Sequence, residues 1–275
     1  GRAHLEGFGS EEGIARAKAE ILYGLSRDGA FVCHGDSKWL PLWKKLSAGH
    51  RMVTFGEAAH CDVRVLDTTV KTHWDEHGFR QRFRIFIRGH EIEAEVPLAG
   101  RHNRMNATAA IAVAVESGIP EEIAVFGLKF VTPVRGRLFP LVTETGMRVI
   151  DDSYNANPES VAAAIRVLTE LGGNSVLVLG DLAELGEDAR GIHAVLGRVA
   201  RELGVNRLYT LGQLSVAAAE EFGKGAQAYT QIDALVADLQ RDARSEDVIL
   251  VKGSRSARME QVVEALMQQQ EEQAC

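Results

Sequence analysis

The sequence predicts an α/β protein whose second half is built on a parallel β-sheet with helices on both faces. Short runs rich in Val, Leu and Ile alternate with segments of helical periodicity from residue 147 to residue 267. These runs are continuously apolar, which is typical of parallel strands buried on both faces. The 275 residues are 45% hydrophobic and 25% charged, which is enough for one large or two ordinary globular domains.

Five successive β–α units are expected in the second half of the chain. The five strands are predicted at residues 147–150, 175–179, 207–211, 227–229 and 248–251. The helices that follow them are predicted at residues 158–171, 187–203, 214–222, 232–243 and 257–267.

The first half has a mixed pattern. Ser10 is a candidate N-cap for a helix that runs to about Leu25. Strands are expected at residues 30–33, 52–55 and 62–66, and an Ala-rich helix is expected from Asn103, its candidate N-cap, to about Ser117. The change from mixed to regularly alternating structure places a domain boundary between residues 135 and 136.

A β-hairpin is the clearest element of the first half. Residues 79–87 alternate between apolar and basic side chains, and they can pair with residues 91–98 through a turn at residues 88–90. The side chains predicted to share the buried face are Phe79, Gln81, Phe83, Ile85 and Ile87.

Charge and cysteine content narrow the functional class. The net charge is -7, and basic and acidic residues are interleaved without a basic stripe, which disfavours nucleic-acid binding. No apolar run reaches 18 residues, so no membrane span is expected. The three scattered cysteines, Cys33, Cys61 and Cys275, fit a reducing cytoplasm. We therefore expect a cytoplasmic protein, and we expect it to be monomeric.

Polar residues follow three of the predicted parallel strands. Asp152, Asp181 and Lys252 each stand at a strand's carboxyl end, where open α/β sheets bind ligands. The segment from Asp151 to Pro158 is too polar for a simple connection between a strand and a helix, and its composition predicts a binding loop. The alternative is that its Asp and Asn residues are turn formers and N-caps.

Candidate residues also occur in the first half. Lys18 shares a helical stripe with Ile14 and Ile21, so its amine is either buried and nucleophilic or extends past the stripe into solvent, and the pattern alone favours the second. His4 lies in a glycine-bracketed loop before this helix, where anions and metals bind. Asn103 and Asn106 are either helix caps or amides that form hydrogen bonds with a heterocyclic ligand.

Seven segments, in this order along the chain, resemble the Mur ligases of bacterial cell-wall synthesis. They are residues 4–10, 15–20, 100–110, 136–138, 151–158, 180–186 and 251–260. The segments His-Leu-Glu-Gly-Phe-Gly-Ser and Asp-Ser-Tyr-Asn-Ala-Asn-Pro are similar to those of the ligases that add a dipeptide. The resemblance implies the remainder of a central ATP-binding domain at residues 1–135 and a C-terminal Rossmann-like ligase domain at residues 136–275.

The resemblance also implies a reaction. ATP phosphorylates the carboxylate of UDP-N-acetylmuramoyl-tripeptide, and the amine of D-alanyl-D-alanine attacks the acyl phosphate. ATP and Mg²⁺ are the implied cofactors, with Mg²⁺ offsetting charge on the transferred phosphoryl group.

Residue roles follow from the matched motifs. Lys18 matches a lysine that becomes carbamylated and helps to hold Mg²⁺, and His4 matches a residue at the magnesium and phosphate site. Asn103 and Asn106 match contacts to adenine. Arg137 and Asp152 match nucleotide contacts. Residues placed around the incoming dipeptide are Ser153, Tyr154, Asn155, Asn157, Asp181, Lys252 and Ser254.

Two departures from the family pattern limit what this chain is expected to do alone. The 275 residues contain neither the domain that binds the uridine nucleotide nor a GxxxxGK[ST] P-loop. The segment from His34 to Ser37 replaces the usual Asn-Ala-Asp-Asp, although Asp36 persists. We therefore expect the isolated chain to be inactive. The alternatives are another amino-acid ligase of the superfamily, such as a folylpolyglutamate synthase, or a non-catalytic α/β binding module.

Overall fold

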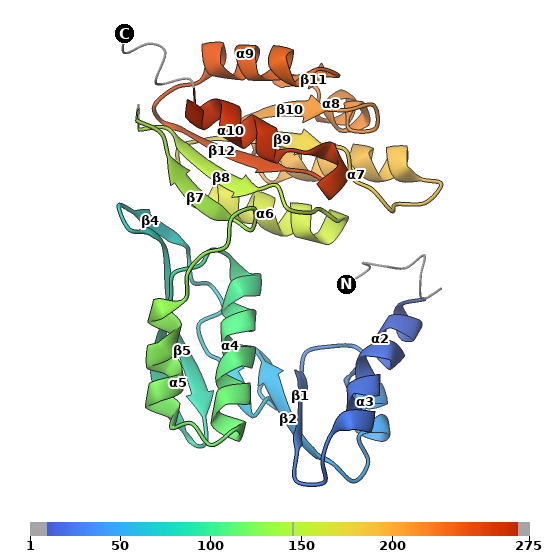
Figure 1. The fold of residues 1–275 in the computed structure, drawn as a ribbon, viewed down its shortest axis with the longest axis vertical. Helices are drawn as coiled ribbons and strands as arrows, with labels where there is room; N and C mark the ends of the chain where they lie inside the picture. The colour runs from blue at the N-terminus through green and yellow to red at the C-terminus, as the bar shows by residue number, and fades with distance from the viewer. Residues whose placement is uncertain (1–9, 145, 269–275) are drawn as a thin grey trace. The chain divides into compact units, whose positions relative to one another are not determined.

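The computed structural model describes residues 10–144 and 146–268, and the chain divides into two compact units (Figure 1). Unit 1 comprises Gly1–Asp75 and Phe79–Thr132, and unit 2 comprises Glu76–Gly78 and Pro133–Cys275. Both units combine helices with a mainly parallel or mixed sheet, which confirms the predicted α/β class.

Unit 1 contains a mixed six-stranded sheet in the order β1-β2-β3-β5-β4, with β6 also paired to β5. Strands β1, β2 and β3 are parallel, and β5 is antiparallel to both β3 and β6. The strands are β1 (Ala30–His34), β2 (Arg51–Gly56), β3 (Val63–Val65), β4 (His73–Asp75), β5 (Gly78–Ile87) and β6 (His90–Val96). The helices are α2 (Glu11–Ala19), η1 (Glu20–Gly24), α3 (Leu40–Leu46), α4 (Arg101–Glu116), α5 (Glu121–Gly127) and η2 (Leu128–Phe130).

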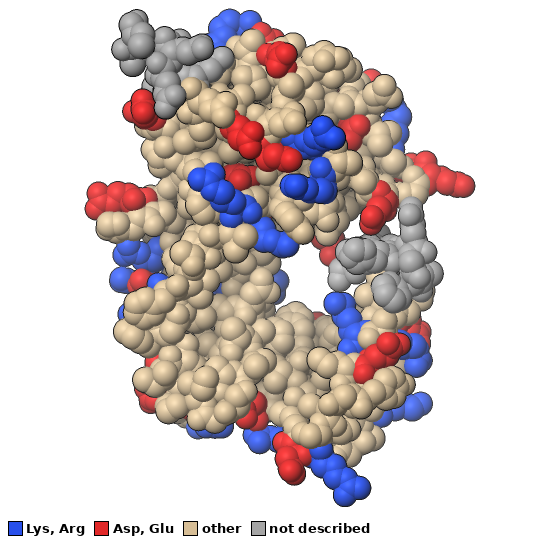
Figure 2. All heavy atoms as spheres, in the orientation of Figure 1, with Lys and Arg blue, Asp and Glu red and all other residues tan. Residues whose placement is uncertain are grey.

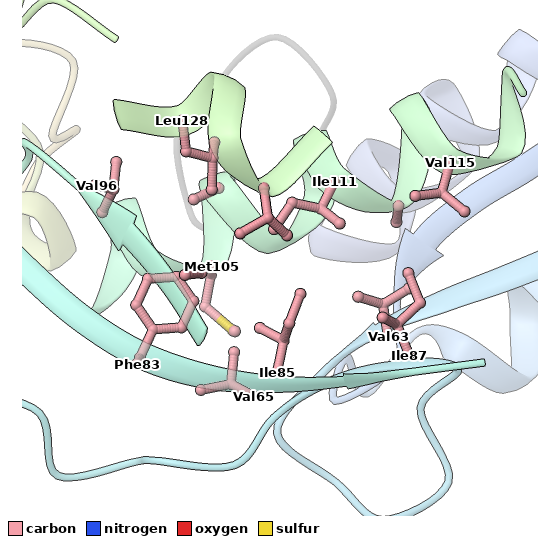
Figure 3. Close-up of a cluster of buried hydrophobic side chains, with 14 residues drawn as sticks. Val63, Val65, Phe83, Ile85, Ile87, Val96, Met105, Ile111, Val115 and Leu128 are labelled. Carbon is pink, nitrogen blue, oxygen red and sulfur yellow. The ribbon is translucent and has the colours of Figure 1, made fainter. Parts of the chain in front are cut away.

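The β5–β6 hairpin supplies much of the core of unit 1. Its predicted inward face is confirmed, because all five of its alternating side chains from Phe79 to Ile87 are buried. Figure 3 shows Ile85 and Val65 beneath Ile111 of α4, with Phe83 beside Met105 of the same helix. The sheet therefore packs one apolar face against α4 and α5.

Unit 2 has a six-stranded sheet in the order β11-β10-β9-β12-β8-β7. The strands are β7 (Phe139–Val142), β8 (Arg148–Asp152), β9 (Asn174–Gly180), β10 (Arg207–Leu211), β11 (Ala226–Tyr229) and β12 (Asp247–Lys252). The helices are α6 (Pro158–Glu170), α7 (Ala189–Glu202), α8 (Val216–Phe222), α9 (Ile232–Asp242), η3 (Arg255–Ala257) and α10 (Glu260–Gln268).

The five predicted strands of unit 2 are confirmed as parallel neighbours. Helices α9 and α10 pack with one face of the sheet in a buried apolar cluster, and α6 packs on β9 and β12. Strand β12 returns between β9 and β8, so the strand order reverses at this point. Such a switch point is where open α/β sheets bind ligands.

Several elements differ from the sequence predictions, and α3 and β4 were not expected at all. Strand β7 was not expected, and it pairs antiparallel to β8 at the edge of the sheet. The first helix is α-helical only to Ala19 and continues as a 3₁₀ helix to Gly24. Asn103 is not the N-cap of α4, since Gly100 takes that place with a φ of 86° that suits glycine.

Surface features agree with the composition. Basic and acidic side chains are interspersed over the face drawn in Figure 2. None of the helices in the described ranges is long and apolar enough to cross a membrane.

Candidate functional site

The structure brings the predicted polar residues of unit 2 to the carboxyl edge of its sheet. Asp152 is the last residue of β8 and Lys252 the last of β12, and the two strands are paired at these positions. The ammonium of Lys252 lies 2.7 Å from Oδ2 of Asp152 and also donates to the carbonyl of Asn155 at 2.9 Å. Its side chain is only 2% exposed, so the ammonium is directed at the protein interior.

Burial and charge act in opposite directions on Asp152. Burial raises the pKa of this carboxyl above its usual value, while the Lys252 ammonium and the N–H of Leu138 counteract the rise. The adjacent Asp151 carboxylate raises the pKa further. The ionised form of Asp152 therefore depends on the neighbouring Lys252 ammonium for its stabilisation.

Two consecutive aspartates hold the turn formed by Gly136, Arg137 and Leu138, called here the 136–138 turn. Asp151 Oδ2 accepts the N–H of Gly136 at 3.0 Å, and Asp152 Oδ1 accepts the N–H of Leu138 at 3.1 Å. Gly136 and Leu138 have φ values of 77° and 49°. Positive φ is costly for leucine, so the hydrogen bonds that the turn donates to the two aspartates stabilise a strained turn.

The 136–138 turn presents Arg137 to the ring of Tyr154. The guanidinium lies 4.4 Å from the ring centroid, and that of Arg255 lies 6.0 Å from the same ring. Tyr154 is 48% exposed, and both arginines are exposed. Two cations beside an accessible aromatic ring can bind an anionic or planar ligand group.

Asp151 and Arg255 also belong to this arrangement, although neither was predicted as a site residue. Both lie inside segments that were singled out, namely residues 151–158 and 251–260. Their local sequence shows that they are polar loop residues, but not that one holds the 136–138 turn and the other approaches Tyr154.

Several predicted binding residues use their polar atoms within the loop itself. Asn157 caps α6 by accepting the N–H of Ser160 at 2.8 Å, and Ser160 Oγ accepts the N–H of Asn157 in return. Ser153 Oγ donates to Asp151 Oδ1 at 2.6 Å. Asn155 Oδ1 accepts the N–H of Ala156, although its side chain is exposed. The capping alternative therefore holds for Asn157.

Asp181 organises the loop after β10. Its carboxylate accepts the N–H groups of Gln213, Leu214 and Ser215, the last at 2.7 Å. Ser254 Oγ donates to the carbonyl of Asp181 at 2.6 Å. These bonds join the ends of β9, β10 and β12 into one edge.

Asn103 and Asn106 lie in the first two turns of α4 in unit 1. Asn103 Nδ2 donates to the carbonyl of Ala99 at 2.9 Å, and Asn106 Nδ2 donates to Asn103 Oδ1 at 3.3 Å. Asn106 is exposed, and Asn103 is partly buried. The pair thus forms a connected amide group whose outer member can exchange hydrogen bonds with a heterocycle.

The same edge of unit 1 carries two fixed carboxylates. Asp36 accepts the N–H groups of Glu57 at 2.7 Å and Ala58 at 2.9 Å. Burial alone would raise the pKa of Asp36, but these hydrogen bonds and nearby His34 hold it below its usual value. Glu57 in turn makes a two-bond ion pair with Arg101, the first residue of α4.

Lys18 is exposed on α2. The buried side of this helix is formed by Ile14, Ala15 and Ala19, and Ile21 is 67% exposed because the 3₁₀ turn after Ala19 changes the direction of the following side chains. The alternative in which the Lys18 amine is buried is therefore wrong. The Lys18 side chain extends into solvent, as the other alternative predicted. His4 lies outside the described residues.

Comparisons with known proteins agree with this architecture. The Mur ligase middle domain family matches residues 1–114, and the family described as Mur ligase, glutamate ligase domain, matches residues 136–255. A relative from Escherichia coli, named UDP-N-acetylmuramoyl-tripeptide–D-alanyl-D-alanine ligase, is 38% identical over 97% of this chain. A Bacillus subtilis relative of the same name is 34% identical over 98% of this chain.

Solved structures show the same two-unit fold. MurF from Acinetobacter baumannii aligns with 98% of this chain at a TM-score of 0.86 and 32% identity. The chain spans 58% of the length of that protein and of both relatives. A folylpolyglutamate synthase from Thermotoga maritima shares the fold at a TM-score of 0.65 and 18% identity. The two matched domains and these relatives show that the chain belongs to the Mur ligase family.

Proposed function

We propose that this chain is part of an ATP-dependent ligase that joins D-alanyl-D-alanine to UDP-N-acetylmuramoyl-tripeptide, a step of peptidoglycan precursor synthesis. The observation that carries the proposal is the similarity to ligases of that name over nearly the whole chain, at 38% and 34% identity. The likeness to folylpolyglutamate synthase, at 18% identity, supports the fold alone.

The proposed chemistry is activation of a carboxylate followed by amide formation. ATP transfers its γ-phosphoryl group to the tripeptide carboxylate. The dipeptide amine attacks the acyl carbon, and phosphate leaves from the tetrahedral intermediate. These two steps would consume one ATP for each amide bond formed.

Different residues of the chain support different parts of this reaction. In unit 1, the exposed amide of Asn106, backed by Asn103, is proposed to bind adenine. In unit 2, Arg137 is proposed to contact the nucleotide, with Asp152 acting through the 136–138 turn. Tyr154 and Asn155 are the exposed loop residues proposed to contact the dipeptide. Residues that shape this edge from within are Ser153, Asn157, Asp181, Lys252 and Ser254.

Mg²⁺ binding is proposed for a modified Lys18 and for His4, which lies outside the described residues. Mg²⁺ requires oxygen ligands, and an unmodified ammonium offers none. A carbamate formed on the lysine amine would supply two oxygens, and the exposed position of Lys18 leaves it accessible to carbon dioxide. Bound Mg²⁺ would offset phosphate charge during acyl phosphate formation.

Phosphate release tests the overall proposal. The complete natural protein that carries this chain is incubated with ATP and Mg²⁺, with each substrate alone and with both together. We expect release of phosphate and formation of UDP-N-acetylmuramoyl-pentapeptide only when the tripeptide nucleotide and D-alanyl-D-alanine are both present. Equal turnover with glutamate and a folate would overturn the assignment.

A lysine substitution tests the carbamate. Lys18→Ala should abolish ligase activity, whereas Lys45→Ala, which removes another exposed lysine, should leave it unchanged. A ¹³C carbamate signal should appear in the wild-type protein with labelled bicarbonate and be absent from Lys18→Ala. Full activity of Lys18→Ala would exclude this role.

The adenine contact has its own test. Asn106→Ala should raise the KM for ATP by about tenfold, the effect of losing one or two hydrogen bonds, with little change for the dipeptide. Asn106→Asp keeps the shape and one acceptor but removes the donor. An unchanged KM for ATP in both variants would remove Asn106 from the nucleotide site.

A further inference from the structure

The buried Lys252 ammonium holds two points at the end of β8 and in the segment that follows it, namely Asp152 and Asn155. One contact is the ion pair with Asp152 Oδ2 at 2.7 Å, and the other is the hydrogen bond to the carbonyl of Asn155 at 2.9 Å. The side chain is 2% exposed, so neither contact is available to solvent. Lys252 therefore acts on the protein rather than directly on a ligand.

The Asp152 carboxylate links Lys252 to the 136–138 turn. Its Oδ1 accepts the N–H of Leu138 at 3.1 Å, while its Oδ2 is held by Lys252. Leu138 has a φ of 49°, a conformation that persists only where its surroundings enforce it. The backbone N–H of Tyr154 also donates to the carbonyl of Gly136 at 3.0 Å, so the turn and the loop are joined.

We propose that Lys252 is a positioning residue that holds Asp152 against the 136–138 turn and holds Asn155 at the sheet edge, and thereby fixes Arg137 over the ring of Tyr154. This positioning role refines the proposed ligase function. Only the kinetic test of the role depends on ligase activity. Lys252 would set the arrangement of Arg137 and Tyr154 without touching nucleotide or dipeptide.

Strand β12 provides a matched control at its opposite end. Its first residue, Asp247, is fully buried and pairs with Arg207, the first residue of β10. Arg207→Met thus removes a basic partner from a buried carboxylate on the same strand, but far along that strand from the 136–138 turn. Any effect shared by Lys252→Met and Arg207→Met reflects the loss of a buried ion pair in general.

Amide hydrogen exchange tests the positioning role without substrate. In Lys252→Met, the N–H of Leu138 should exchange about tenfold faster or more, as expected for a weakened hydrogen bond to a charged group. Arg207→Met should leave the exchange of Leu138 unchanged. Unchanged protection of Leu138 in Lys252→Met, or equal loss in both variants, would overturn the proposal.

The pH dependence of unfolding provides a second measurement, which applies even if Lys252→Met is too unstable at neutral pH. The charged groups next to Asp152 are Lys252 on β12 and Asp151 on β8, with Arg137 on the adjoining turn. Because burial raises the pKa of Asp152, folded stability falls as pH rises from the ordinary carboxyl value through the raised one. Without Lys252 this fall extends to higher pH.

The difference in unfolding midpoint between wild type and Lys252→Met should therefore be smallest near pH 4 and widen towards neutrality. The double variant Asp152→Asn, Lys252→Met should lose this pH dependence, because no buried carboxylate remains at that position. A pH-independent difference would contradict the proposed dependence of Asp152 on Lys252.

The kinetic readout separates this proposal from the ligase assignment. If Asp152 must be ionised to hold the turn, the acid limb of kcat/KM for ATP should shift to higher pH by about one unit or more in Lys252→Met. Arg207→Met should keep the wild-type acid limb. If the wild-type protein has no ligase activity, the proposed function fails, while the exchange of Leu138 still decides the role of Lys252.

Discussion

At the residue scale, Gly136 shows how closely the 136–138 turn and the loop around Tyr154 approach each other. Its φ is 77°, and a Cβ at this position would lie 3.0 Å from Cβ of Tyr154 and 3.1 Å from its backbone N. A side chain there would meet backbone strain and a contact so tight that the loop would have to yield by a few tenths of an ångström. Glycine is therefore required for two independent reasons.

Gly136→Ala should destabilise unit 2 by more than the roughly 1–2 kcal/mol that a left-handed conformation costs a non-glycine residue. Gly146→Ala is the matched control, because Gly146 has a φ of 82° with nothing within 4 Å of a built Cβ. Chemical denaturation of both variants measures the difference. Equal losses would show that Tyr154 moves aside freely.

The cysteines give a second prediction at the residue scale. Burial raises the pKa of Cys61 to about 11, with the Asp36 carboxylate adding to the rise, and burial likewise raises the pKa of Cys33 to about 11. At pH 8, only about one thiol in a thousand would then be ionised, against roughly a quarter for an ordinary cysteine.

Both thiols should therefore react slowly with iodoacetamide in the folded protein at pH 8, and faster as pH rises towards 11. Peptide mapping of Cys33 and Cys61 measures the rates, and the urea-unfolded protein is the control. Rapid native-state alkylation of Cys61 would contradict the burial.

At the element scale, the β5–β6 hairpin was predicted correctly because its alternation directly encodes which side is buried. The same pattern placed Gln81 on the apolar face, and only the structure explains why. Gln81 is fully buried and donates to the carbonyls of Leu98 and Gly100, and its Oε1 accepts from Arg104. It joins the hairpin to the start of α4.

Gln81→Leu should destabilise unit 1 by about 2–3 kcal/mol, because two carbonyls and a buried guanidinium lose a partner. Arg82→Leu, on the exposed face of the same strand, should change stability by roughly 0.5 kcal/mol or less. Unfolding monitored by tryptophan fluorescence distinguishes them. A neutral Gln81→Leu would show that water replaces the lost bonds.

The start of α4 was placed incorrectly for a related reason. Asn103 is a good N-cap by residue type, but the chain enters the helix at Gly100, where the carbonyl also binds Gln81. Capping preference is a local rule, and here a contact 19 residues away in sequence decides the boundary. Asn103 is thereby free to support Asn106.

At the scale of the whole molecule, each unit has its own sheet and its own buried apolar cluster. The division falls between Thr132 and Pro133, close to the change of pattern seen in the sequence. Such separate cores allow the units to fold independently.

Residues 133–275 expressed alone should therefore fold into a monomeric α/β domain with a cooperative thermal transition. Circular dichroism and amide proton dispersion provide the measurement, with the 275-residue chain as reference. A disordered product would show that unit 2 depends on unit 1.

The sequence by itself determined the α/β class, the five parallel strands, the hairpin and the family, because apolar periodicity and contiguous motifs are local properties of the chain. It also marked the carboxyl ends of β8, β9 and β12 as the polar edge. The tertiary structure alone decided what each polar group does there. Lys252 and Asp152 are 100 positions apart, and their pairing exists only because β12 returns beside β8. Whether a polar side chain faces a ligand or the protein interior depends on such non-local contacts, which no local pattern encodes.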